Sequence, residues 1–127
     1  RAYLLKLPYL ALTAAYCAVI FWFSSSAAPL HVDMAFAGQD KVVHALVYAG
    51  LAVTIAIGLK RSRVYSPRVW LWAPIVFVAL YGASDEIHQL FVRGRTGDVW
   101  DWSADLAGAV VIQIILRWKG VLSYERP

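Results

Sequence analysis

The feature that most constrains the fold is a set of long apolar stretches, the first of which, residues 7–30, contains no charge at all. A helix needs about 20 predominantly apolar residues to cross the roughly 30 Å hydrocarbon core of a bilayer. Three further stretches are long enough to cross as helices: residues 42–59, 69–92 and 100–118. Hydrophobic residues make up 61% of the chain, well above the usual share in a soluble domain. We therefore predict an integral membrane protein.

The pattern within these stretches favours helices over a β-barrel. Alternation of polar and apolar residues with a period of two is absent, and Ala, Leu and Val dominate. Pro74 is expected to bend the third helix. The predicted fold class is all-α, an integral membrane four-helix bundle that forms a single transmembrane domain over residues 1–127.

The charges are divided unequally between the two ends of such a bundle. One side holds nine basic residues and one acid (+8), and the other holds three basic residues and seven acids (−4), which together give the net charge of +4. Because basic loops stay in the cytoplasm, we expect both termini and the loop at residues 60–68 there, and loops 24–40 and 93–99 outside. The expected partner is the lipid bilayer. We expect no nucleic acid partner, because no motif for nucleic acid binding is present.

Polar residues spaced four apart lie near the outer ends of three predicted helices. Residues with this spacing share one helix face, and Tyr48 extends the first pair by one further turn. The pairs are Asp40 with His44, Asp85 with Gln89, and Asp101 with Asp105. We predict that these faces line one cavity open to the outside. The candidate ligand-binding residues are Asp40, His44, Tyr48, Asp85, Glu86, Gln89, Arg95, Asp101 and Asp105.

Several of these residues also have a purely structural interpretation. Asp40 and Asp101 stand where helices start, so either could be a helix cap, and His44 could be an interhelical hydrogen-bond partner. Asp85 differs, because it lies about two turns before the end of its predicted helix, where a carboxylate costs about 2.5–3.5 kcal/mol to insert. Arg93 and Arg95 could bind an anion, or they could pair with Asp98 and Asp101.

Five carboxylates in one cavity cannot all stay ionised without help, so the cavity should hold protons, a cation or the arginines as counter-charge. A divalent cation such as Mg, Mn or Ca could bind to Asp40, His44, Asp85 and Asp105. Alternatively, Asp85, Glu86 and His44 could carry out acid-base catalysis without a metal. If the arginines neutralise the acids, the cavity instead suits a polar headgroup or a peptide carboxylate.

Three motifs together resemble the VanZ-like family, named for a teicoplanin-resistance membrane protein. They are Asp40-Lys41-x-x-His44 with Tyr48, then Asp85-Glu86-x-x-Gln89-x-Phe91-x-x-Gly94-Arg95, then Asp101-x-x-x-Asp105-x-x-Gly108. The chain departs from the family pattern at Arg93, where proline is frequent, and at Asp105, where asparagine is frequent. The resemblance implies a small protein of the bacterial inner membrane and cell envelope, linked in some members to antibiotic resistance.

Three functions remain open from the sequence. The first is a binding module that takes a polar envelope lipid headgroup or a lipoglycopeptide and contributes to resistance. The second is a non-covalent hydrolase or transferase, with or without a divalent metal, that acts on a phosphorylated or acylated envelope lipid. The third is a structural bundle whose polar residues only join helices. No nucleophile elbow or phosphate-binding glycine loop is present.

Overall fold

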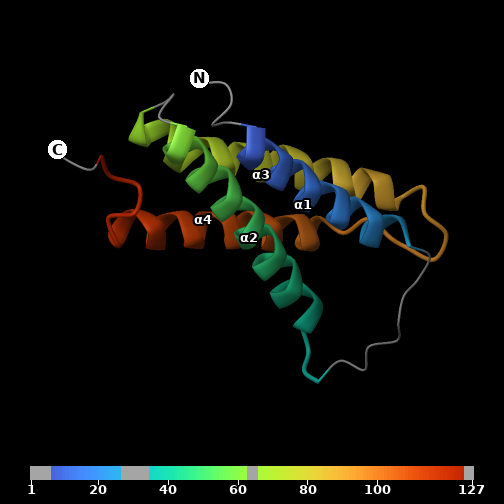
Figure 1. Ribbon diagram of the computed structural model, residues 1–127. Helices are drawn as coiled ribbons and strands as arrows, with labels where there is room; N and C mark the ends of the chain where they lie inside the picture. Colours follow the sequence, from blue (N-terminus) through green and yellow to red (C-terminus); the bar gives the residue numbers. More distant parts are fainter. Residues whose placement is uncertain (1–6, 27–34, 63–65, 125–127) are drawn as a thin grey trace.

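The computed structural model describes residues 7–26, 35–62 and 66–124, and these form four helices without a strand. The helices are α1 (Leu7–Ser25), α2 (Gln39–Ser62), α3 (Pro67–Gln89) and α4 (Val99–Trp118). They run in alternating directions, and α2 crosses the others at a steep angle (Figure 1). The structure confirms the predicted all-α four-helix fold.

The helices pack unequally. The most extensive interface joins α2 to α4, and α3 packs against both of them. Helix α1 contacts α2 and α3 but, within the described residues, not α4. In Figure 1 α1 and α3 follow nearly the same direction, while the first turns of α2 extend away from the other helices. The bundle is therefore a tightly packed unit of α2, α3 and α4 with α1 more loosely attached.

Helix α2 is three residues longer than predicted at each end, and the ends of α1 and α3 also differ from the predicted ones. Helix α1 ends at Ser25, and the rest of the predicted first helix falls mainly on residues 27–34, outside the described residues. Helix α3 ends at Gln89 instead of residue 92, because the next backbone N–H groups bond three residues back and Gly94 turns the chain at a φ of 77°. Asp85 therefore lies one turn from the helix end, about 6 Å, and the prediction of two turns is wrong.

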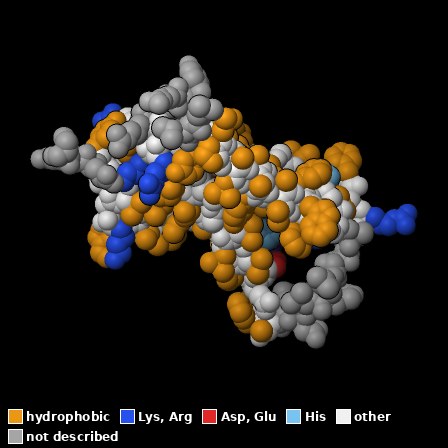
Figure 2. Space-filling model, in the orientation of Figure 1, with side chains coloured by type: hydrophobic (Ala, Val, Ile, Leu, Met, Phe, Trp, Pro, Cys, Tyr) orange, Lys and Arg blue, Asp and Glu red, His pale blue; other side chains and the backbone are white. Residues whose placement is uncertain are grey.

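Three of the four helices, α1, α2 and α4, are long and apolar enough to cross a membrane. Helix α3 falls short of the same criterion, contrary to the expectation that all four could cross alone. Its last turn contains Asp85, Glu86 and Gln89, all of which are buried inside the protein. Figure 2 shows hydrophobic side chains over most of the visible described surface, as a bilayer-embedded protein requires.

Two small or polar residues explain how α4 packs so closely. A Cβ added to Gly108 would overlap the backbone carbonyl of Ala45, so α2 and α4 touch backbone to backbone there. Further along, the fully buried Gln113 donates from Nε2 to the carbonyl oxygens of Trp70 (2.8 Å) and Leu71 (2.7 Å). Pro74 has no N–H to bond the Trp70 carbonyl, so Gln113 satisfies a carbonyl that the proline leaves free.

The two ends of the bundle differ in charge. At the basic end, where α2 and α4 finish and α3 starts, the described charges are Lys60, Arg61, Arg68, Arg117 and Lys119. At the acidic end, where α1 and α3 finish and α2 and α4 start, lie all the described carboxylates. The charge separation inferred from the sequence is thus present in three dimensions, and the candidate residues all lie at the acidic end.

Candidate functional site

Lys41 holds three carboxylates at the outer edge of the acidic end. Its ammonium Nζ lies 2.9 Å from Asp40 Oδ2 and 2.9 Å from Asp98 Oδ2, and it also bonds Asp101 Oδ1. This Lys41 cluster joins the start of α2 to the start of α4. The main counter-charge near these acids is therefore a lysine and not the arginines.

The N-cap of α4 is Asp98, three residues before the expected Asp101. Its side chain accepts a hydrogen bond from the Trp100 N–H (2.8 Å), while Asp101 lies inside the first turn. The Lys41 ammonium, and next the Trp100 N–H, hold the pKa of Asp98 below its ordinary value. Asp98 is thus stabilised as an anion both by a positive side chain and by the end of a helix.

The arginines do not pair with these acids within the described part of the chain. Arg95 donates instead to two backbone carbonyls at the end of α1, from Nε to Ser26 O (3.3 Å) and from Nη2 to Phe23 O (3.2 Å). Asp98 and Asp101 have Lys41 as their partner. The alternative that Arg93 or Arg95 pairs with them is therefore wrong. Arg95 retains N–H donors, because a guanidinium has five.

His44 lies between two carboxylates of α4. Its Nδ1 is 2.7 Å from Asp105 Oδ1, and its Nε2 is 3.6 Å from Asp101 Oδ2. Asp105 is completely buried, and it packs beside Gly82 of α3, where a Cβ would come within 3.0 Å of Asp105 Oδ2. The absence of a side chain at residue 82 thus makes room for a buried acid that fixes the His44 ring.

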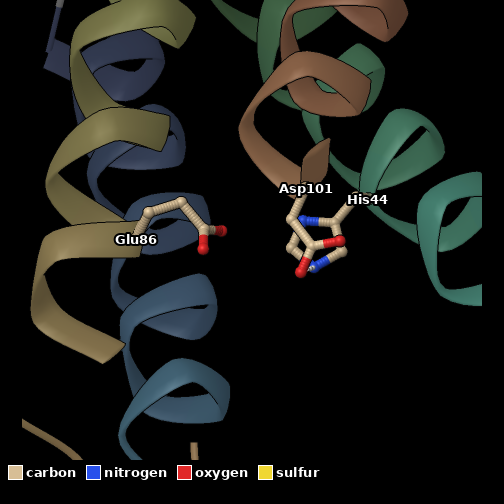
Figure 3. Close-up of side chains that lie close together, drawn as sticks. All are labelled: His44, Glu86 and Asp101. Carbon is tan, nitrogen blue, oxygen red and sulfur yellow. Dashed lines mark ion pairs between the residues drawn. The ribbon is translucent and has the colours of Figure 1, made fainter. Parts of the chain in front are cut away.

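Glu86 approaches the same histidine from α3. One carboxylate oxygen, Oε2, accepts the backbone N–H of Asp98 (2.8 Å), while the other, Oε1, is buried without a hydrogen-bond partner among the described residues. Figure 3 shows the Glu86 carboxylate extending toward Asp101 and His44. One ligand atom from each of these three residues lies within 4.8 Å of the others, a spacing suited to a metal ion.

Asp85 and its neighbours open into a cavity of about 760 Å³ between α1, α2 and α3. The Tyr48 hydroxyl donates to Asp85 Oδ2 (3.2 Å), so the polar face of α2 meets that of α3. The polar residues that line the cavity are Ser24, Tyr16, His44, Tyr48, Asp85, Gln89 and Arg95. The apolar residues that line it are Leu12, Ala15, Val19, Ile20, Phe23, Val43 and Val47. In Figure 2 a histidine and an acidic side chain are visible in the hollow beside α2.

The candidate residues thus divide between two adjoining places. His44, Tyr48, Asp85, Gln89 and Arg95 line the cavity. Glu86, Asp101 and Asp105 gather on the α4 side of His44, while Asp40 is half exposed and bound to Lys41. Of the four residues predicted to bind a metal, only His44 belongs to the group whose ligand atoms converge.

A serine and a histidine form a further contact that the sequence reasoning missed. Ser25 Oγ lies 2.9 Å from His88 Nε2, and the His88 ring stacks on Phe21 with centroids 4.8 Å apart. Ser25 Oγ already donates to the carbonyl of Phe21 (2.7 Å), so it can only accept from His88. This arrangement attaches α1 to α3 and cannot activate the serine as a nucleophile.

Comparison with known proteins identifies the family of the chain. The family model described as VanZ/LLP1 matches residues 9–120, which include all four helices apart from the first residues of α1. No curated protein and no solved structure gives a significant match to the chain. The matched region contains both the cavity and the residues around His44. The chain is a membrane protein that belongs to the VanZ-like family.

Proposed function

We propose that the cavity binds one amphiphilic molecule of the cell envelope, with its acyl chain along α1 and its polar head at the acidic end. The observation that carries this proposal is the distribution of side chains in the cavity. Its α1 wall is mostly apolar from Leu12 to Phe23, and its polar residues gather near His44 and Asp85. The helix rises about 16 Å from Leu12 to Phe23 at 1.5 Å per residue, close to the roughly 15 Å depth of one leaflet of the hydrocarbon core.

The polar end matches a headgroup that contains both a phosphate and a hydrogen-bond donor. Arg95 reaches the cavity with its guanidinium held by two carbonyls, which positions its remaining N–H groups for an anion. Asp85 and Gln89 are buried beside it and can accept from a hydroxyl or an amine. The volume of about 760 Å³ is within the range typical of small-molecule sites.

The proposal extends to location and resistance. Five described basic residues lie at the basic end, against none of the described acids, so the positive-inside rule places that end in the bacterial cytoplasm and the cavity mouth in the outer leaflet. An envelope lipid and a lipoglycopeptide such as teicoplanin share the chemistry of an acyl chain with a polar head. Capture of either one near the membrane surface would contribute to resistance.

Binding can be tested by native mass spectrometry of the protein released from membranes. We expect one retained lipid per protein, and its loss in Ala15→Trp, because Ala15 lines the cavity and a tryptophan there fills it. Ala14→Trp is the matched control, since Ala14 is exposed on the same helix and does not line the cavity. Equal retention in both variants would contradict the proposal.

The identity of the ligand is tested at the polar end. We expect Arg95→Ala to weaken retention of phosphate-containing lipids by about tenfold or more, as the loss of a charge-assisted contact worth about 1.5 kcal/mol implies. Titration with teicoplanin in place of lipid distinguishes the two ligand sources. In cells, Asp85→Asn and Arg95→Ala should abolish protection against the antibiotic while the protein still inserts; unchanged protection would remove the resistance role.

A second candidate function is a non-covalent hydrolase or transferase acting on a phosphorylated or acylated envelope lipid. It is favoured by one observation, the placement of His44 between Asp105 and Asp101 with Glu86 close by. In that case purified protein in bilayers should convert a lipid-linked phosphate or ester, and His44→Ala should stop the reaction. Absence of product with envelope lipid extracts, with and without divalent metal, would exclude this activity.

A further inference from the structure

We propose that His44, Glu86 and Asp101 bind a divalent first-row transition metal ion at the junction of α2, α3 and α4. The three residues come from three helices and were not grouped as one ligand set by their spacing in the sequence. Their ligand atoms lie within 4.8 Å of one another, and Figure 3 shows the side chains directed toward a shared space. The side chains would have to move only slightly inward, because two ligands on one ion with bonds of about 2.1 Å lie at most about 4.2 Å apart.

Each of the three side chains is hydrogen-bonded through one atom and has a second atom without a hydrogen bond among the described residues. A neighbour occupies His44 Nδ1 (Asp105), Asp101 Oδ1 (Lys41) and Glu86 Oε2 (the Asp98 N–H). The second carboxylate oxygen, Glu86 Oε1, has no hydrogen-bond partner among the described residues. It is also largely shielded from solvent, because Glu86 is only 8% exposed. A buried carboxylate oxygen without a partner is costly, and a cation at this place supplies one.

Asp105 positions the histidine for this role. An ionised Asp105 that accepts from His44 Nδ1 at 2.7 Å favours the neutral tautomer with the proton on Nδ1 and the lone pair on Nε2. That nitrogen is the one that faces Asp101, 3.6 Å from Oδ2. A carboxylate behind a ligating histidine is a frequent arrangement in metal sites, where it fixes the tautomer and the orientation of the ring.

The local charge also favours a cation. Asp85, Glu86 and Asp105 are buried and the Asp101 side chain is 14% exposed, whereas Lys41 is the ammonium that contacts this part of the described structure. One imidazole and two carboxylates suit Zn²⁺ or Mn²⁺, with the remaining positions open to water or to an anionic ligand. His44 also lines the cavity, but the test of the metal site is independent of the lipid-binding proposal, because the metal alone is the probe.

The test is a titration of the purified, metal-stripped full chain in detergent with Co²⁺, followed by visible absorption, and with Zn²⁺ or Mn²⁺, followed by calorimetry. We expect binding of one ion and a rise in the unfolding temperature with metal. Absence of a Co²⁺ absorption band together with absence of heat would overturn the proposal, whatever the behaviour of any variant.

Variants then locate the ion. Glu86→Gln should lower the affinity at least tenfold, and Asp105→Asn should lower it about 10- to 100-fold by removing the negative charge behind the His44 ring. Asp40→Asn is the matched control: it removes a carboxylate from the Lys41 cluster that is half exposed and outside the three ligands, so the affinity should change less than twofold. An equal loss in Asp40→Asn and Glu86→Gln would show diffuse attraction to acids and overturn the site, and an unchanged Asp105→Asn would overturn the positioning role.

Discussion

Gln113 in the middle of α4 and Glu86 at the acidic end are both buried polar residues, but their surroundings differ. The Gln113 amide donates to two backbone carbonyls, one of which Pro74 leaves without its helical partner. Glu86 accepts one backbone N–H and keeps its second oxygen unpartnered. Gln113 Oε1 is likewise buried without a hydrogen-bond partner among the described residues, but the Gln113 Nε2 has a structural role within the chain. The unpartnered Glu86 oxygen belongs instead to an acid whose ligand atoms lie close to those of His44 and Asp101.

The comparison separates two kinds of buried polar group. Toward the basic end, the residues around Ala56, Trp70 and Leu122 form an apolar cluster. Gln113 bonds the Trp70 carbonyl, which Pro74 leaves without its helical partner. At the acidic end, a cavity and several buried carboxylates lie side by side. A protein stabilised only by helix packing would not need the second arrangement, so we expect mutations there to impair binding more than folding.

The largest effect is expected where the α2 and α4 backbones meet. In Gly108→Ala the new methyl group would overlap the Ala45 carbonyl, so the helices must separate at a cost of about 3 kcal/mol. The unfolding temperature in detergent measures this. Ala107→Leu, on the exposed neighbouring position, should leave it nearly unchanged, and a similar result for Gly108→Ala would show that the close contact is not required.

The structural role of Gln113 can be isolated by a double-mutant cycle. Gln113→Leu should destabilise the protein by about 1–3 kcal/mol, because the Trp70 carbonyl is then buried without a partner. In the Pro74→Ala background the same substitution should cost less, since the alanine introduced there can donate its own N–H to that carbonyl. Identical costs in both backgrounds would refute the link between Pro74 and Gln113.

A smaller effect on folding is expected for Tyr48→Phe. The change removes the hydrogen bond to Asp85, and we expect a loss of about 0.5–1.5 kcal/mol together with weaker lipid retention in native mass spectrometry. The contrast with Gln113→Leu is the informative part, because Gln113→Leu should reduce stability without selectively reducing retention. If Tyr48→Phe changes stability alone, the acidic end is structural.

The smallest effect is expected for Asp98→Asn, and it should depend on pH. Asparagine still caps a helix, so the substitution removes mainly the charge that faces Lys41. Because the folded pKa of Asp98 is lowered, its ionised form stabilises the fold above the ordinary aspartate pKa of about 3.9, and this contribution is lost as pH falls through the lower folded value. The difference in unfolding temperature between wild type and variant should therefore begin to shrink as the pH falls below about 4 and disappear only below the folded pKa of Asp98. A difference that does not shrink as the pH falls would contradict the role of the charge.

Much of the architecture could be predicted from local patterns. The uncharged run in α1 and the other apolar stretches indicate membrane helices, and the structure contains helices at each of these stretches. Helix ends were less predictable, as the turn after Gln89 shows, because apolar residues continue beyond it. Hydrophobicity reports where a helix can exist, whereas hydrogen bonding decides where it ends.

The partners of the polar residues were largely beyond prediction. Periodicity placed Tyr48 one turn from His44 and Asp85 one turn from Gln89. It could not show that the Tyr48 hydroxyl donates to Asp85 across the two helices. It also did not assign Lys41 to three acids or Arg95 to the carbonyls of α1. Side-chain spacing along one helix is a local property, but contacts between helices depend on their crossing angle and rotation.

The sequence by itself determined a helical membrane protein with a basic end and an acidic end, because apolar length and charge act locally along the chain. Only the tertiary structure decided that α1 leaves a cavity beside His44 and Asp85, and that Glu86 and Asp101 reach the other side of the same ring. The reason is physical: buried acids from different helices share one neighbourhood only after packing has fixed the distances between the helices.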